Sequence, residues 1–223
     1  PRDGAGHARR CCAAAPLKPA DPTQARRARD PRPGASPLVW ALALGALGLG
    51  LRLAWTLDAS RLPWFELPQT DDFVYLEGAR RIAAGDVLLR GHDLRFGPAF
   101  FYVLALVRVV LGADPIAPRL VHAAVGAATI PIVWDAARRV VGPRWALVTA
   151  AMAAVYGPMV FFTGLVLPET WLVFFHALFL AAVLRGLDAA PGARAAWLVA
   201  GLAMGASIAL RPNAALLLLP ALV

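Results

Sequence analysis

Two adjacent carboxylates, Asp71 and Asp72, stand at the head of a stretch whose residue pattern predicts a helix over residues 71–85. Its apolar face holds Tyr75, Leu76, Ala79, Ile82 and Ala83, and its charged face holds Glu77, Arg80 and Arg81. A carboxylate at a helix start is stabilised by the helix dipole, so the pair could simply cap this helix. The same group could act as a general base that takes a proton from a hydroxyl. The residues alone leave both roles open.

Two further charged residues stand beside apolar stretches. Glu169 follows Pro168, and it could be a solvated turn residue or a companion to Asp71 in one cavity. Arg211 precedes Pro212, a pair that suggests a broken or re-entrant helix, and such breaks commonly line cavities. Its guanidinium could hold a phosphate or could reach the membrane interface as a snorkelling arginine. Both alternatives stay open for each residue.

No metal site or catalytic triad is indicated by the remaining reactive residues. Cys11 and Cys12 are adjacent, a spacing that suits neither a metal site nor a disulfide framework. The other polar candidates, which show no ligand spacing, are His7, His92, Asp93, Arg95, His122 and His176. These residues therefore give no sign of a metal or cofactor site.

The elements that must position these residues are helices that cross a membrane. The 223 residues are 59% hydrophobic and 16% charged, and the apolar residues gather in blocks near the length of about 20 that a spanning helix needs. The predicted fold is all-α, a polytopic transmembrane helical bundle over residues 38–223. Its spans are expected at 38–56, 116–137, 146–163, 170–185 and 195–210, with another starting at 213. A soluble protein with buried helices is disfavoured because most of these blocks lack a charged face.

The net charge of +8 lies largely in residues 1–37 and in short runs between the apolar blocks. This placement is typical of cytoplasmic segments in membrane proteins, and no basic stripe suggests nucleic-acid binding. Residues 1–37 have no apolar periodicity, so we expect a disordered basic tail in the cytoplasm. Since the chain begins with Pro1 and ends inside an apolar run, we expect it to be the amino-terminal part of a longer protein.

The apolar stretch at 97–112 decides the topology. If it spans, the loop that holds Arg138, Arg139 and Arg144 faces outward, against the positive-inside rule. If it lies at the interface like residues 71–85, that loop is cytoplasmic, Glu169 faces outward, and Arg185 and Arg194 fall inside. We adopt this second topology, with two interfacial helices in the first outer loop. Arg52, near the end of the first span, is expected to snorkel to the interface.

The order of these features resembles the GT-C superfamily of membrane glycosyltransferases. The nearest likeness is to glycosyltransferase family 39, the protein O-mannosyltransferase-like branch that includes the bacterial aminoarabinose transferases. Four stretches carry it: TDDFVYLEGARRIAAGD at 70–86, FGPAFFYVLALVRVVLG at 96–112, RLVHAAVGAATIPIVWDAARRVVGPRWALVTAAMAAVYGPMVFFTG at 119–164, and GLAMGASIALRPNAALLLLP at 201–220. Asp71 falls on the family's catalytic aspartate, and Asp72 falls where relatives often have glutamate.

The resemblance implies an inverting glycosyltransferase of the hexosyltransferase type, acting at the outer face of a bacterial cytoplasmic (inner) membrane. The donor would be a sugar on polyprenyl phosphate, and the acceptor an unknown protein, lipid or glycan. Asp71 would be the catalytic base, and Asp72, Tyr75, Glu169 and Arg211 would bind substrate without a metal. The alternative is a non-catalytic polytopic membrane protein, either part of a transporter or a scaffold for envelope assembly.

Overall fold

A computed structural model describes residues 36–65, 71–91, 97–188 and 194–221. Nearly all of the predicted disordered tail, including Cys11 and Cys12, lies outside the described residues. His92, Asp93 and Arg95 lie outside them as well.

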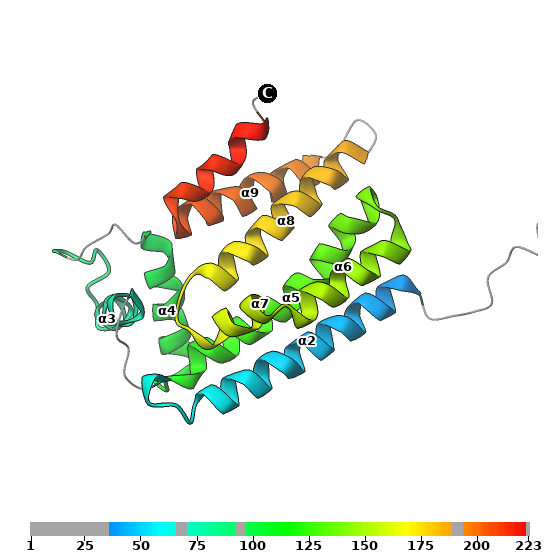
Figure 1. Ribbon diagram of the computed structural model, residues 1–223. Coiled ribbons are helices and arrows are strands. Elements are labelled where there is room, and N and C mark those ends of the chain that lie inside the picture. Colours follow the sequence, from blue (N-terminus) through cyan, green and yellow to red (C-terminus); the bar gives the residue numbers. More distant parts are fainter. Residues whose placement is uncertain (1–35, 66–70, 92–96, 189–193, 222–223) are drawn as a thin grey trace, which may run out of the picture. The chain divides into compact units, whose positions relative to one another are not determined.

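All regular elements among the described residues are helices and none is a strand, which confirms the predicted all-α class. Helices run side by side in a bundle (Figure 1). They are α2 (Pro37–Ala59), α5 (Ile116–Val140), α6 (Pro143–Val155), the one-turn α7 (Gly157–Phe161), α8 (Glu169–Asp188) and α9 (Arg194–Leu210). Among them α2, α5 and α8 are long and apolar enough to cross a membrane, and α6 joined with residues 157–164 makes a fourth candidate. The chain is a multi-pass membrane protein, and which stretches cross the bilayer stays a prediction.

Residues 146–163 were expected as one span, and the structure divides them between two helices. The axes of α6 and of the Gly157–Gly164 segment meet at 49°. Pro158 lacks the amide hydrogen that would continue the helix, and Tyr156 turns to extended backbone before it. The Gly-Pro pair therefore breaks the helix, and a 3-10 turn, η3 (Phe162–Gly164), follows α7.

Small residues let the helices of the bundle approach closely. Ala146, Ala150 and Ala154 recur every four residues, so they share one face of α6, and all three are fully buried. They pack with Ala41 of α2 and Ile130 of α5 in one cluster. Such small-residue faces favour close packing between membrane helices.

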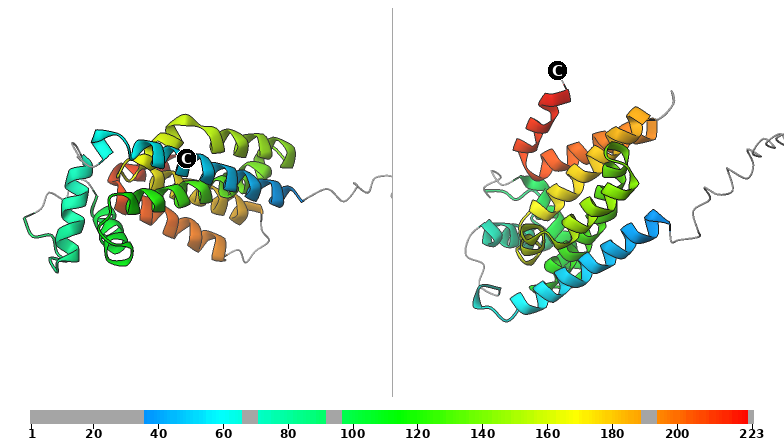
Figure 2. Two further views of the ribbon diagram at one scale, coloured as in Figure 1. Left: turned by 90° about the horizontal axis from the view of Figure 1, so that it is seen from below. Right: turned by 45° about the vertical axis from the view of Figure 1, so that its right-hand side comes forward.

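Two shorter helices, α3 (Asp71–Ala83) and α4 (Pro98–Leu111), pack together across one end of the bundle (Figures 1 and 2). Tyr75, Phe100 and Phe101 form the centre of their shared core, which also contains Val166 and Leu210 of the bundle. At 13 and 14 residues these helices are about 20 Å long, too short to cross about 30 Å of hydrocarbon. Their place at a membrane interface stays a prediction.

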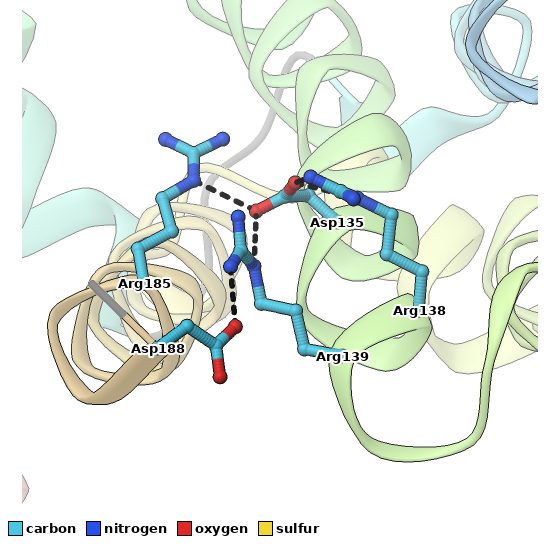
Figure 3. Close-up of polar contacts among 5 residues, drawn as sticks. All are labelled: Asp135, Arg138, Arg139, Arg185 and Asp188. Atoms are coloured by element: carbon cyan, nitrogen blue, oxygen red, sulfur yellow. Dashed lines mark hydrogen bonds and ion pairs between the residues drawn. The ribbon is translucent and has the colours of Figure 1, made fainter. Parts of the chain in front are cut away.

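A charged cluster joins α5 to α8 at the opposite end (Figure 3). Asp135 accepts hydrogen bonds from Arg138, Arg139 and Arg185, at N–O distances of 2.6–3.4 Å. Arg139 also reaches Asp188 at 2.6 Å. The arginines that the charge pattern assigned to one side of the membrane therefore meet at one end of the bundle.

Arg52 does not snorkel, so that expectation is wrong. Its side chain is only 1% exposed and lies inside the bundle. Its Nη1 donates to the carbonyl oxygens of Gly48, at 3.0 Å, and Ala154, at 3.3 Å. A side chain on Gly126 would approach Arg52 Nε to 2.7 Å, so this glycine makes room for the guanidinium. Local space and backbone acceptors hold the arginine inside.

Candidate active site

Helix α3 begins where its sequence places the acidic pair. Asp71 and Asp72 lie in its first turn, where the helix dipole favours negative charge. Asp72 Oδ1 accepts a hydrogen bond from the Phe73 amide at 3.1 Å. Beyond the last turn Gly85 has a φ of 105°, a left-handed conformation that glycine adopts without strain. The pattern expected for this segment is thus present, and Asp71 stands at its start.

Glu169 and Arg211 form an ion pair at this end of the bundle. Glu169 opens α8, and Arg211 directly follows the last residue of α9. Their Oε1 and Nη2 atoms lie 2.5 Å apart, and their side chains are 25% and 35% exposed. The second oxygen of Glu169, Oε2, is buried and has no hydrogen-bond partner among the described residues. The carboxylate therefore keeps one unused acceptor.

Tyr75 brings this ion pair together with Asp71. Its ring meets Phe100 edge-on at a centroid distance of 4.8 Å and lies 5.2 Å from Phe101. The pKa of Tyr75 is raised to about 12, first by burial of its hydroxyl. The positive charge and hydrogen bond of Arg211 lower this pKa, and the charges of Glu169 and Asp71 raise it. Four of the predicted site residues thus converge from three segments of the chain.

The adjacent residues Asp71 and Asp72 interact with different parts of the protein. The charge of Asp72 acts on the guanidinium of Arg119, in the first turn of α5. Helical geometry accounts for the separation, because neighbouring residues on a helix point about 100° apart. Asp71 and the Glu169–Arg211 pair therefore both act on Tyr75, whereas Asp72 acts on Arg119 of α5.

Arg119 is a residue of this region that the sequence reasoning missed. Its guanidinium is 2% exposed and donates to the carbonyl oxygens of Gly164, at 2.8 Å, and Phe65, at 3.0 Å. It also stacks over the Phe65 ring at 3.8 Å. It ties α5 to the turn η1 (Pro63–Phe65) that precedes α3 and to η3. The sequence feature that could have identified Arg119 is its position as a charged residue just inside an apolar block.

Within the described residues, no group of three or more histidine, cysteine, aspartate or glutamate side chains could hold a metal ion. The expectation of a metal-free site stays a prediction. The arrangement offers a carboxylate base at a helix start, a guanidinium for an anion, and a carboxylate with a free acceptor oxygen. Such a set suits the transfer of a group between a hydroxyl and an anionic leaving group.

The fold defines an all-α membrane protein, and the cluster gives it a candidate active site at one end of the bundle. A family model described as dolichyl-phosphate-mannose-protein mannosyltransferase matches residues 96–223, more than half of the chain. The chain therefore belongs to that family, as its motifs suggested, and membership implies a lipid-linked sugar donor. No curated protein and no solved structure matches the chain. The matched segment contains Glu169 and Arg211 and begins after α3, so it does not bear on Asp71, Asp72 or Tyr75.

Proposed function

We propose that this protein transfers a sugar from a polyprenyl-phosphate donor to an acceptor hydroxyl or amine, with inversion at the anomeric carbon. The reaction takes place at the outer face of a bacterial cytoplasmic membrane. Asp71 is the general base, and Asp72, Tyr75, Glu169 and Arg211 bind substrate. No metal takes part.

The observation that carries the proposal is the convergence of charged groups around Tyr75. Its hydroxyl is influenced by Asp71 from the start of α3, Glu169 from the start of α8, and Arg211 from the end of α9. These residues are up to 140 positions apart in the sequence (211 − 71) and meet at one end of the bundle. Gathering these groups costs each of them part of its hydration, and the unpaired oxygen of Glu169 leaves this cluster one acceptor that a ligand could use.

The proposed transfer has three parts: removal of a proton from the acceptor, attack on the sugar, and departure of the phosphate. The Asp71 carboxylate takes the proton of the acceptor, whose oxygen or nitrogen attacks the anomeric carbon. The bond between that carbon and the phosphate oxygen breaks, and polyprenyl phosphate leaves with the electron pair. Arg211 offsets the negative charge that grows on the leaving phosphate. Displacement from the opposite side inverts the anomeric configuration.

The proposed outer placement follows from charge. The cluster of Asp135 with Arg138, Arg139 and Arg185 lies at the other end of the bundle, and arginine-rich ends favour the cytoplasm. An active site at the opposite end would then face outward. Helices α3 and α4 would lie along that surface, beside a donor whose chain stays in the bilayer.

The direct test is Asp71→Asn in the protein reconstituted into liposomes with a polyprenyl-phosphate hexose. Loss of the base should lower the transfer rate by about 10²–10⁴-fold and leave the unfolding temperature nearly unchanged. A matched control is Glu77→Gln, which removes a carboxylate paired with Arg80 on the same helix. Glu77→Gln should retain transfer. Equal rates for the wild type and Asp71→Asn would reject Asp71 as the base.

A further inference from the structure

The segment that leads to Glu169 is not part of a helix. The turn η3 ends at Gly164, Leu165 has extended backbone with a φ of −102°, and α8 begins only at Glu169. Val166 and Pro168 of this segment are fully buried. Buried carbonyl groups outside a helix lack the donors that a helix supplies, and leaving them unpaired is costly. The position of the segment therefore depends on donors from elsewhere in the bundle.

Two side chains on successive turns of α5 supply such donors. Arg119 Nε donates to the Gly164 carbonyl at 2.8 Å, and His122 Nδ1 bonds the Leu165 carbonyl at 2.9 Å. A carbonyl oxygen only accepts, so Nδ1 of His122 carries the hydrogen. His122 is 1% exposed, and its Nε2 has no hydrogen-bond partner among the described residues. The bond that orients this ring therefore goes to a residue four positions before Glu169.

His122 also contacts the aromatic core that contains Tyr75. Its ring lies against Phe100 at a centroid distance of 6.0 Å, with the two planes 24° apart. Phe100 in turn meets the ring of Tyr75, whose hydroxyl feels the charges of Glu169 and Arg211. His122 thus lies between the segment that carries Glu169 and the core that carries Tyr75.

We propose that His122 is a positioning residue, which holds Glu169 beside Tyr75 through its bond to the Leu165 carbonyl. The inference rests on the proposed function and adds to it a residue that touches neither donor nor acceptor. Without this bond the segment can shift, and the Glu169–Arg211 pair moves with it. A misplacement of about 1 Å at a reacting centre can lower the rate about 100-fold. A side chain that only filled the core would instead be replaceable by any group of similar size.

The test measures sugar transfer by His122→Asn and His122→Leu in the liposome assay. The Nδ2 atom of asparagine is as many bonds from the backbone as Nδ1 of histidine, so it can donate to the Leu165 carbonyl. Leucine has nearly the same size and shape and no donor, and both variants lose the ring that lies against Phe100. His122→Asn should transfer within about threefold of the wild type, and His122→Leu about 10- to 100-fold more slowly.

A second variant guards against a packing defect in His122→Leu. His122→Phe keeps an aromatic ring beside Phe100 and also lacks the donor, so it should lose transfer as His122→Leu does. The matched control is Thr129→Val on the same helix. The buried Thr129 hydroxyl bonds the Val125 carbonyl of α5 itself, at 2.9 Å, so its loss should leave transfer unchanged.

A double variant shows whether His122 acts through Glu169. In a protein that already carries Glu169→Gln, His122→Leu should slow transfer by less than about threefold, because the position of residue 169 then matters little. A purely structural role would make the two losses multiply, since each would act independently.

The inference fails if His122→Asn and His122→Leu transfer at equal rates, or if His122→Phe keeps transfer. It also fails if the double variant shows the full product of the two losses. These results are read in a wild type that transfers sugar and loses transfer on Asp71→Asn, so they overturn the role of His122 alone. A wild type without transfer rejects the proposed function itself, and the inference with it.

Discussion

The two ends of the bundle use charged residues in opposite ways. At one end Asp135 is 8% exposed and accepts hydrogen bonds from three arginines, so both of its oxygens are occupied. At the other end Glu169 accepts one bond from Arg211, and its second oxygen has no partner among the described residues. A fully paired carboxylate fastens helices together, because a ligand could bind it only by displacing an arginine. A half-paired carboxylate holds helices together less firmly, and under the proposed function its second oxygen gains a partner only when substrate binds.

The largest effect on stability is expected from Asp135→Asn. The change leaves Arg138, Arg139 and Arg185 close together without the anion that they share (Figure 3). Asp135 is buried, but Arg138 and Arg185 are 38% and 53% exposed, so removing its charge should cost about 2–3 kcal/mol, less than the loss from a fully buried network. Thermal or denaturant unfolding of the protein in detergent should show a loss of this size.

Asp188→Asn is the matched control for that change. Asp188 binds Arg139 in the same cluster, but its side chain is 56% exposed. Exposed ion pairs contribute about 0–1 kcal/mol, so this variant should unfold nearly like the wild type. If the two variants lost equal stability, Asp135 would not be the residue that joins α5 to α8.

The end that holds Glu169 can be tested by titrating the hydroxyl of Tyr75. The pKa of Tyr75 is raised to about 12 by burial, from an ordinary value near 10. The folded protein therefore holds this proton more firmly than the unfolded chain. The contribution of Tyr75 to stability is complete below about pH 10 and is lost as the pH rises toward 12, by at most about 3 kcal/mol. Phenolate absorbance, taken as the difference between the wild type and Tyr75→Phe, should show a midpoint near pH 12. A midpoint near pH 10 would mean that the site is open to water.

Much of the bundle end that holds the candidate active site could be predicted from the sequence, because its features depend on neighbouring residues. The acidic pair, the helical periodicity and Gly85 are all read within one stretch, and the structure has α3 there. Glu169 stood out because it follows Pro168 between two apolar blocks, and Arg211 because Pro212 follows it at the end of another. Arginine counts in the loops placed Arg138 and Arg185 on one side, and the structure brings both to Asp135.

The interior of the bundle could not be predicted in the same way. Arg52 and Arg119 each stand near the end of an apolar block, where an arginine is expected to reach the interface. Whether such a side chain turns inward depends on space and acceptors supplied by distant residues. Gly126 supplies the space for Arg52, and the carbonyls of Ala154 and Gly164 accept hydrogen bonds from Arg52 and Arg119. No sequence pattern encodes contacts of this kind.

The helix break at Gly157-Pro158 is different, because its Gly-Pro pair can be recognised in the sequence. The sequence analysis nevertheless predicted one continuous span over residues 146–163.

Glycine substitutions can test the interior between the two ends. An alanine at Gly48 would place its methyl group against Ile130 Cδ1 and 3.0 Å from Arg52 Nη1. Overpacking of this kind costs about 1–3 kcal/mol, so Gly48→Ala should lower the unfolding temperature. Gly50 lies on the same helix with nothing within 4 Å of an added methyl group. Gly50→Ala should be neutral or raise stability by up to about 1 kcal/mol, since alanine favours helices. Similar losses in both variants would show that α2 is not packed as described.

Glu169→Gln should change stability only slightly, and this variant tests the comparison between the two ends most directly. It removes one carboxylate charge, as Asp135→Asn does at the other end. The Glu169–Arg211 pair is 25% and 35% exposed, and glutamine can still accept a bond from Arg211, so stability should change by less than about 1 kcal/mol. Transfer should nevertheless fall by tenfold or more, because Arg211 loses the charge that holds it beside Tyr75. Unfolding and transfer measured on one preparation separate the two effects. If Glu169→Gln unfolded as easily as Asp135→Asn and kept its activity, both ends of the bundle would be structural.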